Sequence, residues 1–129
     1  MVAGQRRSEI LVIEDDDQVR DAIRALLESE GYSVLAASNG KDALERLNRI
    51  HPPALILLDL LMPVMSGQEF LAELIKEDAI NFSKIPIVVI TGASGDKWIE
   101  SIKPFTAVSL RKPVDVDALL GIVAQYVSV

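Results

Sequence analysis

The chain has 129 residues, half of them hydrophobic, which is the size of one compact domain able to bury a core. Its 19 acidic residues outnumber its 13 basic ones, and this net charge of -6 argues against nucleic-acid or anionic-membrane surfaces, which need basic residues. The absence of cysteine excludes disulfides, thiolate metal sites and thiol chemistry, and it fits a reducing cytosol. No apolar run approaches the roughly 18 residues of a membrane span, and the first residues lack a signal-peptide core. We therefore expect a cytoplasmic protein without direct contact to nucleic acid or membrane.

The first predicted strand runs directly into a block of like charge. The apolar residues ILVI at 10–13 are followed by four consecutive acids at 14–17. Asp16 and Asp17 are typical of a helix N-cap and first turn, where side-chain oxygens and negative charge are favoured. The helix that follows is indicated by an apolar stripe of Val19, Ile23, Leu26 and Leu27.

The rest of the chain continues this alternation of strand and helix. Continuous apolar runs at 54–58 and 85–90 are typical of strands buried on both faces of a parallel sheet, and weaker runs at 32–37 and 107–110 fit flanking strands. Apolar residues at helical spacing predict four further helices. Their stripes are Ala43, Leu44, Leu47 and Ile50; Phe70, Leu71, Leu74 and Ile75; Trp98, Ile99 and Ile102; and, after an N-cap at Asp115, Val116, Leu119, Leu120, Val123, Ala124 and Val127.

Five strand and helix repeats predict an α/β fold with a doubly wound parallel sheet and five helices, because right-handed crossovers place helices on both faces. Ligands of such sheets lie beyond the carboxyl ends of the strands. The polar residues expected at that edge are Glu14, Asp15, Asp59, Thr91 and Lys112.

These side chains suggest a particular chemistry. Three carboxylates close together cannot all stay ionised without compensation, and Mg2+ supplies it while leaving positions open for a phosphate. Lys112 would add a second positive charge, and Thr91 would bring a hydroxyl within reach. Asp59 is the central carboxylate and therefore the expected nucleophile toward phosphorus.

Four short motifs carry a resemblance to a known family. VIEDD at 12–16, LLDLLMPVMSG at 57–67, VIT at 89–91 and RKP at 111–113 resemble the receiver domain of two-component response regulators, in the same order and spacing. The resemblance covers 10–127 and implies a flavodoxin-like sheet with strand order 2-1-3-4-5. It also implies one receiver domain over 1–129, with its core at about 9–128 and no output domain within these residues. The sequence leaves open whether this receiver stands alone or belongs to a longer protein.

The resemblance also implies a role for each site residue. Asp59 would accept a phosphoryl group from the phosphohistidine of a sensor histidine kinase or phosphotransfer protein. Mg2+ would be bound by Asp15 directly, by Glu14 mostly through water, by Asp59 and by the backbone carbonyl of Leu61. Thr91 would hydrogen-bond the phosphoryl group, Lys112 would pair with it, and the Lys112-Pro113 bond would be cis.

The chain departs from the family pattern at Ser109, where an aromatic residue is usual. A serine cannot fill and vacate a pocket as a ring does, which leaves open how phosphorylation is transmitted. Phe105, Trp98 and backbone shifts after Thr91 are the alternatives. A partner surface over the fourth helix, fifth strand and last helix would include Trp98, Ile122 and Tyr126. His51, before two prolines, is expected to be a plain loop residue.

Three other functions remain to be tested. A pseudo-receiver would keep the fold as an interaction module without phosphorylation, and Ser109 keeps that alternative open. A phosphatase of the haloacid-dehalogenase type would need a second acid two residues after Asp59, where Leu61 stands. A flavodoxin-like electron carrier would bind phosphate after the first strand, where the acidic block would repel it.

Overall fold

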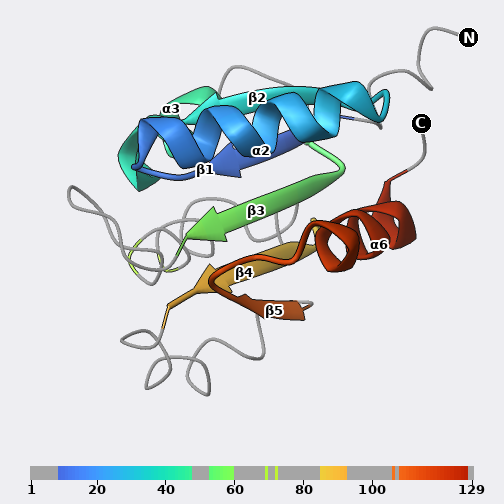
Figure 1. Ribbon diagram of the computed structural model, residues 1–129. Helices are drawn as coiled ribbons and strands as arrows, with labels where there is room; N and C mark the ends of the chain where they lie inside the picture. The colour runs from blue at the N-terminus through green and yellow to red at the C-terminus, as the bar shows by residue number, and fades with distance from the viewer. Residues whose placement is uncertain are drawn as a thin grey trace, which may run out of the picture.

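Five parallel strands form one sheet at the centre of the molecule (Figure 1). The computed structural model describes residues 9–47, 53–59, 69, 72, 85–92, 106 and 108–127. The strand order is β2-β1-β3-β4-β5, which confirms the predicted order. The strands are β1 (Glu9–Ile13), β2 (Ser33–Ala37), β3 (Leu55–Asp59), β4 (Ile87–Thr91) and β5 (Val108–Arg111).

The three central strands separate two hydrophobic cores. Successive side chains of a strand point to opposite faces, so Ile10 and Val12 join one core while Leu11 and Ile13 join the other. All five residues of β3 and of β4 are buried, as expected for strands covered on both faces. The continuous apolar runs in the sequence therefore have a direct cause in this two-sided burial.

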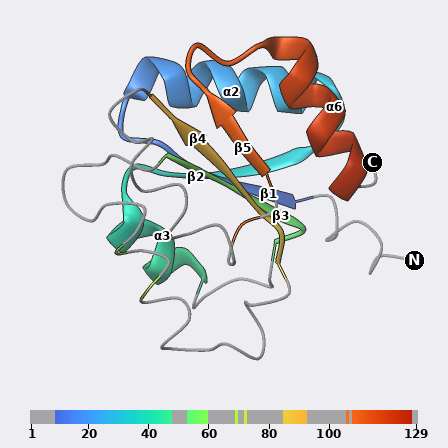
Figure 2. The ribbon, with the colours of Figure 1, turned by 90° about the horizontal axis from the view of Figure 1, so that it is seen from below.

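Helices cover both faces of the sheet (Figure 2). Helices α2 (Asp17–Ser29) and α6 (Val116–Tyr126) lie on one face, and α3 (Gly40–Leu47) lies on the other. The predicted helices at 70–75 and 98–102 lie outside the described residues, apart from Ala72, which is helical like the neighbouring Glu69. Among the described helices, none has both the length and the apolar character needed to cross a bilayer.

Helix α2 begins and ends with local signals that the sequence contains. Asp16 is the N-cap, and its carboxylate accepts hydrogen bonds from the backbone N–H groups of Gln18 and Val19 at 2.9 and 3.1 Å. At the other end the N–H of Tyr32 donates to the carbonyl of Leu27, and Gly31 adopts a φ of 95°. This Schellman-type ending requires a left-handed residue, which glycine provides at little cost.

The predicted N-cap of α6 is also confirmed, because the Asp115 carboxylate accepts from the N–H of Ala118 at 2.8 Å. Three described members of the predicted apolar stripes are exposed, however. Val19 in α2 is 39% exposed and Val116 in α6 is 51% exposed. Both lie in the first turns of their helices. Ala124 is exposed as well, so the buried stripe of α6 is narrower than predicted.

Candidate functional site

Three carboxylates meet where the central strands end. One oxygen from each of Glu14, Asp15 and Asp59 lies within 4.8 Å of the others. The register explains this meeting, because Ile13 pairs with Leu58, so Glu14 and Asp59 follow at the same level of neighbouring strands. The predicted convergence of these acids at the carboxyl edge is therefore observed.

The site is buried at Glu14, Asp59 and Thr91 and exposed at Asp15 and Lys112. Glu14 is 2% exposed, Asp59 is 3% exposed and Thr91 is buried at the end of β4. Lys112, which follows β5, brings its Nζ to 3.5 Å from Asp59 Oδ2 and 3.7 Å from Glu14 Oε1. The Lys112-Pro113 bond is cis, as expected. Lys112, at the end of the edge strand β5, thus contacts both the carboxylate that follows β1 and the carboxylate that ends β3.

The pKa of Glu14 is shifted well above the usual range of a glutamate. The pKa of Glu14 is raised to about 7, mainly by burial and also by the nearby charge of Asp59, while a backbone hydrogen bond from Asp16 and the charge of Lys112 oppose the shift. Its Oε2 accepts that backbone N–H at 3.2 Å. Its Oε1 is buried and accepts no hydrogen bond from the described residues.

A buried carboxylate oxygen without a hydrogen-bond donor fits a site for a hard cation. Mg2+ prefers oxygen ligands and uses few carboxylates, and a divalent charge would offset the repulsion among Glu14, Asp15 and Asp59. Asp15 is exposed, so the cluster is open to solvent on one side. Leu61, whose carbonyl was predicted as a further ligand, lies outside the described residues. The described donor set therefore fits Mg2+.

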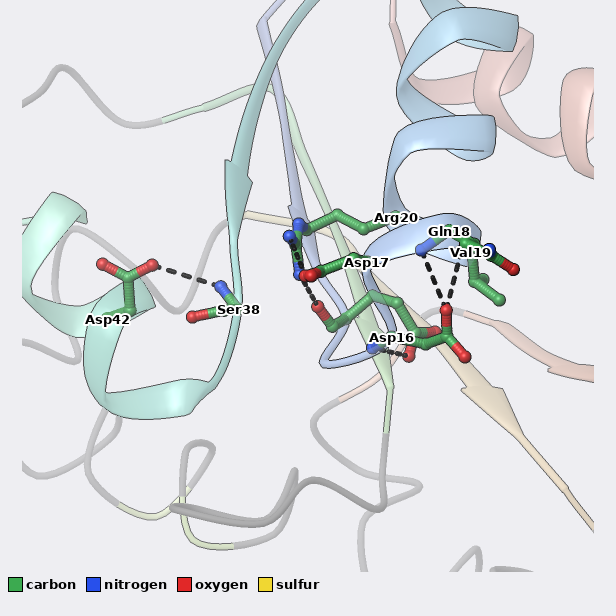
Figure 3. Close-up of polar contacts among 8 residues, drawn as sticks. Asp16, Asp17, Gln18, Val19, Arg20, Ser38 and Asp42 are labelled. Atoms are coloured by element: carbon green, nitrogen blue, oxygen red, sulfur yellow. Dashed lines mark hydrogen bonds and ion pairs between the residues drawn. The ribbon is translucent and has the colours of Figure 1, made fainter.

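The two remaining acids of the block have different partners (Figure 3). Asp16 caps α2, and Asp17 forms an ion pair with Arg20 one turn later. Arg20 also donates from Nη1 to the backbone carbonyl of Glu14 at 2.9 Å. The four consecutive acids therefore have different surroundings: Glu14 and Asp15 belong to the carboxylate cluster, Asp16 caps α2 and Asp17 pairs with Arg20. The sequence reasoning missed Arg20, although its spacing of three residues from Asp17 is that of a helical ion pair.

The chain is similar in sequence to proteins of known family. The family model described as "Response regulator receiver domain" matches residues 10–124. The chain belongs to the response regulator receiver family.

Relatives of this receiver agree in sequence and fold. It is 37% identical over 122 residues to "Response regulator Rre1" of Synechocystis sp., covering 92% of this chain and 51% of that protein. A crystal structure of a response regulator receiver domain protein from Clostridium thermocellum matches with a TM-score of 0.79 and 28% identity, covering 92% of each chain. The chemotaxis protein CheY4 of Vibrio cholerae has the same fold, with a TM-score of 0.83 and 24% identity over 94% of this chain and 99% of that one.

The receiver spans about half the length of the first curated relatives that it matches. As a member of this family it is a signalling module of two-component systems rather than an enzyme, and receivers of this family partner with histidine kinases.

At the family's usual aromatic position, Ser109 is exposed on the edge strand β5. The Thr91 hydroxyl donates to the carbonyl of Gly92 at 3.1 Å. Trp98 and Phe105, the predicted alternatives for transmitting the signal, lie outside the described residues. Of the predicted partner surface, Tyr126 is exposed, whereas Ile122 packs partly buried against the core.

The receiver also has an apolar groove between α2 and α6, with a volume of about 450 Å³. Val19 and Val116 line it, and these are the two valines whose exposure differs from the prediction. Lys112 and Pro113 form part of its wall, so the groove reaches the lysine that contacts Asp59. Sequence reasoning missed this feature because each valine belongs to an ordinary helical stripe.

Proposed function

We propose that this receiver accepts a phosphoryl group on Asp59 and that Mg2+ assists the transfer. The arrangement of the three carboxylates and Lys112 supports the proposal, because Asp59 lies beside two other acids that could hold a cation and 3.5 Å from the Lys112 ammonium group. The proposed metal ligands are Glu14, through water, Asp15, Asp59 and the Leu61 carbonyl. Mg2+ would neutralise phosphoryl oxygens as charge develops on them.

In the proposed reaction an Asp59 carboxylate oxygen attacks the phosphorus of a phosphohistidine. The new P–O bond forms as the donor's P–N bond breaks, and the bonding electron pair leaves with the imidazole. The Lys112 ammonium group, 3.5 Å from Asp59, balances the added negative charge. Thr91 ends the strand next to Asp59, where its hydroxyl could leave the Gly92 carbonyl and donate to the phosphoryl group. Such a change of partner would convert phosphorylation into a conformational signal.

The test is the intact mass of the protein after incubation with a small acyl phosphate donor, with and without Mg2+. Wild type should gain the mass of one phosphoryl group only with the metal, and Asp59→Asn should gain none. Asp117→Asn is the matched control, because Asp117 is an exposed aspartate in the first turn of α6. No adduct on folded, metal-loaded wild type would favour the pseudo-receiver alternative instead.

We propose further that the protein donor docks in the groove between α2 and α6. The groove has a mostly apolar lining that includes Lys112, so a helix bound in it would bring a phosphohistidine toward Asp59. Val116→Lys should then slow transfer from a phosphohistidine protein and leave phosphorylation by the small acyl phosphate unchanged. Equal loss with both donors would indicate damage to the site itself. The surface that includes Trp98, Ile122 and Tyr126 remains our proposal for a downstream partner.

A further inference from the structure

Arg20 is the first basic residue after the acidic block, and its side chain turns back toward that block (Figure 3). Nη1 donates to the backbone carbonyl of Glu14 at 2.9 Å, and Nη2 pairs with the carboxylate of Asp17. The side chain is only 17% exposed, although its partner Asp17 is 80% exposed. Arg20 is thus packed against the loop and is not a freely solvated surface charge.

The hydrogen bond to Glu14 acts on one particular peptide unit. The Glu14 carbonyl belongs to the peptide bond that joins Glu14 to Asp15, the two acids that β1 contributes to the cluster. The N–H of Glu14 is held separately, by the carbonyl of Ala37 in β2 at 3.1 Å. Both backbone polar groups of Glu14 are therefore hydrogen-bonded, the N–H to β2 and the carbonyl to Arg20.

We propose that Arg20 is a positioning residue for the cation site, a role that rests on the proposed function of that site. It holds the Glu14 to Asp15 peptide so that both carboxylates face the position that Mg2+ would occupy, without itself contacting the metal. Outer groups that orient ligands commonly affect metal affinity by about 10- to 100-fold.

Because Arg20 is positively charged, the direction in which Mg2+ affinity changes when Arg20 is removed separates a positioning role from a purely electrostatic one. A guanidinium group near the cluster repels a cation, so if Arg20 acted only through its charge, removing it would tighten Mg2+ binding. If Arg20 orients the loop, removing it weakens binding. Arginine suits this role because its planar fork reaches two acceptors at once, whereas a lysine ammonium group is a compact point charge.

The experiment measures Mg2+ affinity of the full chain by isothermal titration calorimetry at pH 8. Wild type is compared with Arg20→Ala, Arg20→Lys and Arg24→Ala. Arg24 is the matched control, because it lies one turn further along α2 and pairs with exposed Glu28 at 3.4 Å. We expect Arg20→Ala to bind Mg2+ about tenfold more weakly, Arg20→Lys to fall between Arg20→Ala and wild type, and Arg24→Ala to match wild type.

The Mg2+ dependence of phosphorylation distinguishes an effect on metal binding from an effect on the phosphoryl transfer itself. In acyl phosphate reactions Arg20→Ala should need about tenfold more Mg2+ for half-maximal phosphorylation, yet reach the wild-type rate at saturating Mg2+. Circular dichroism without metal checks that the variants are folded. If Arg20→Ala does not fold, Arg20→Lys decides the matter: weaker binding than wild type supports positioning, and equal binding overturns it.

The remaining outcomes separate the two proposals. Unchanged or tighter Mg2+ binding by folded Arg20→Ala, with binding by wild type, would overturn the role of Arg20 and leave the cation site in place. An equal loss in Arg24→Ala would also overturn it, since the weaker binding would then not depend on the contact between Arg20 and the Glu14 carbonyl. Absence of Mg2+ binding by wild type would instead remove the proposed site itself.

Discussion

Glu14 is a carboxyl group in an environment that disfavours its charge. It is almost fully buried, lies beside Asp59 and has an oxygen that accepts no hydrogen bond from the described residues. Burial raises its pKa from 4.5 to about 7, so the folded protein retains a proton there that the unfolded chain has already released. Between these two pKa values the native state is therefore favoured by low pH.

This behaviour predicts how stability changes with pH in the absence of metal. The contribution of Glu14 is fully present below pH 4.5 and is lost as the pH rises to about 7. The raised pKa corresponds to about 3 kcal/mol of unfolding free energy. Urea unfolding in EDTA at pH 5 and pH 8 should show this loss in wild type but not in Glu14→Gln. The exposed Glu28→Gln serves as control, and a parallel pH dependence of Glu14→Gln and wild type would contradict the assignment.

At the scale of single elements, the helix ends were readable from the sequence and the helix faces only partly so. Asp16 and Asp115 were identifiable as N-caps because capping depends on a few neighbouring backbone groups. The exposure of Val19 and Val116 depends on what packs against each helix, whereas the helical period of the sequence shows only which residues share a face. The predicted strands all exist, although β4 begins after Pro86 rather than at Ile85.

The cap of α2 should make a measurable contribution of its own. Asp16→Ala removes the acceptor for two backbone N–H groups and should lower the free energy of unfolding by about 1 kcal/mol. Asp16→Asn keeps a capping oxygen and should lose much less. Denaturant unfolding measures both variants, and an equal loss in Asp16→Asn would point to the charge of Asp16 rather than its hydrogen bonds.

A substitution in helix α6 should instead increase the stability of the protein. Gly121 lies in its interior, and a methyl group added there would meet nothing within 4 Å. Gly121→Ala should therefore raise the free energy of unfolding by about 0.5–1 kcal/mol, since alanine loses less backbone entropy in a helix. Unchanged or lower stability of this variant in thermal and denaturant unfolding would show that α6 is distorted at Gly121.

At the scale of the whole molecule, the order of strands determines which residues meet. Acids about 45 residues apart in the sequence converge because β1 pairs with β3, and the two-sided apolar runs made this sheet predictable. The ends of the predicted strands indicated the five candidate side chains, and the resemblance added the strand order, the Leu61 carbonyl and a role for each residue. The contacts of Arg20 and the groove were not predictable, since both depend on side-chain packing between a helix and a loop.

Binding of Mg2+ should stabilise the whole domain. A cation that binds only the folded state at ten times its dissociation constant adds about 1.4 kcal/mol, or about 5 °C in melting temperature for a chain of this size. Asp15→Asn should reduce this increase because it removes one carboxylate of the cluster. Thermal unfolding with increasing Mg2+ measures the effect, and an equal increase in Asp15→Asn would exclude Asp15 as a ligand.

The carboxylates of Glu14 and Asp59 can meet only when β1 and β3 pair in their native register. Glu14 and Asp59 lie at the same level only because Ile13 pairs with Leu58. A slip of one residue between β1 and β3 would turn the apolar side chains of one strand toward the wrong core and separate the two carboxylates. Cation binding at this cluster would therefore report correct strand alignment, so metal titration of a preparation would count the molecules whose sheet has assembled in its native register.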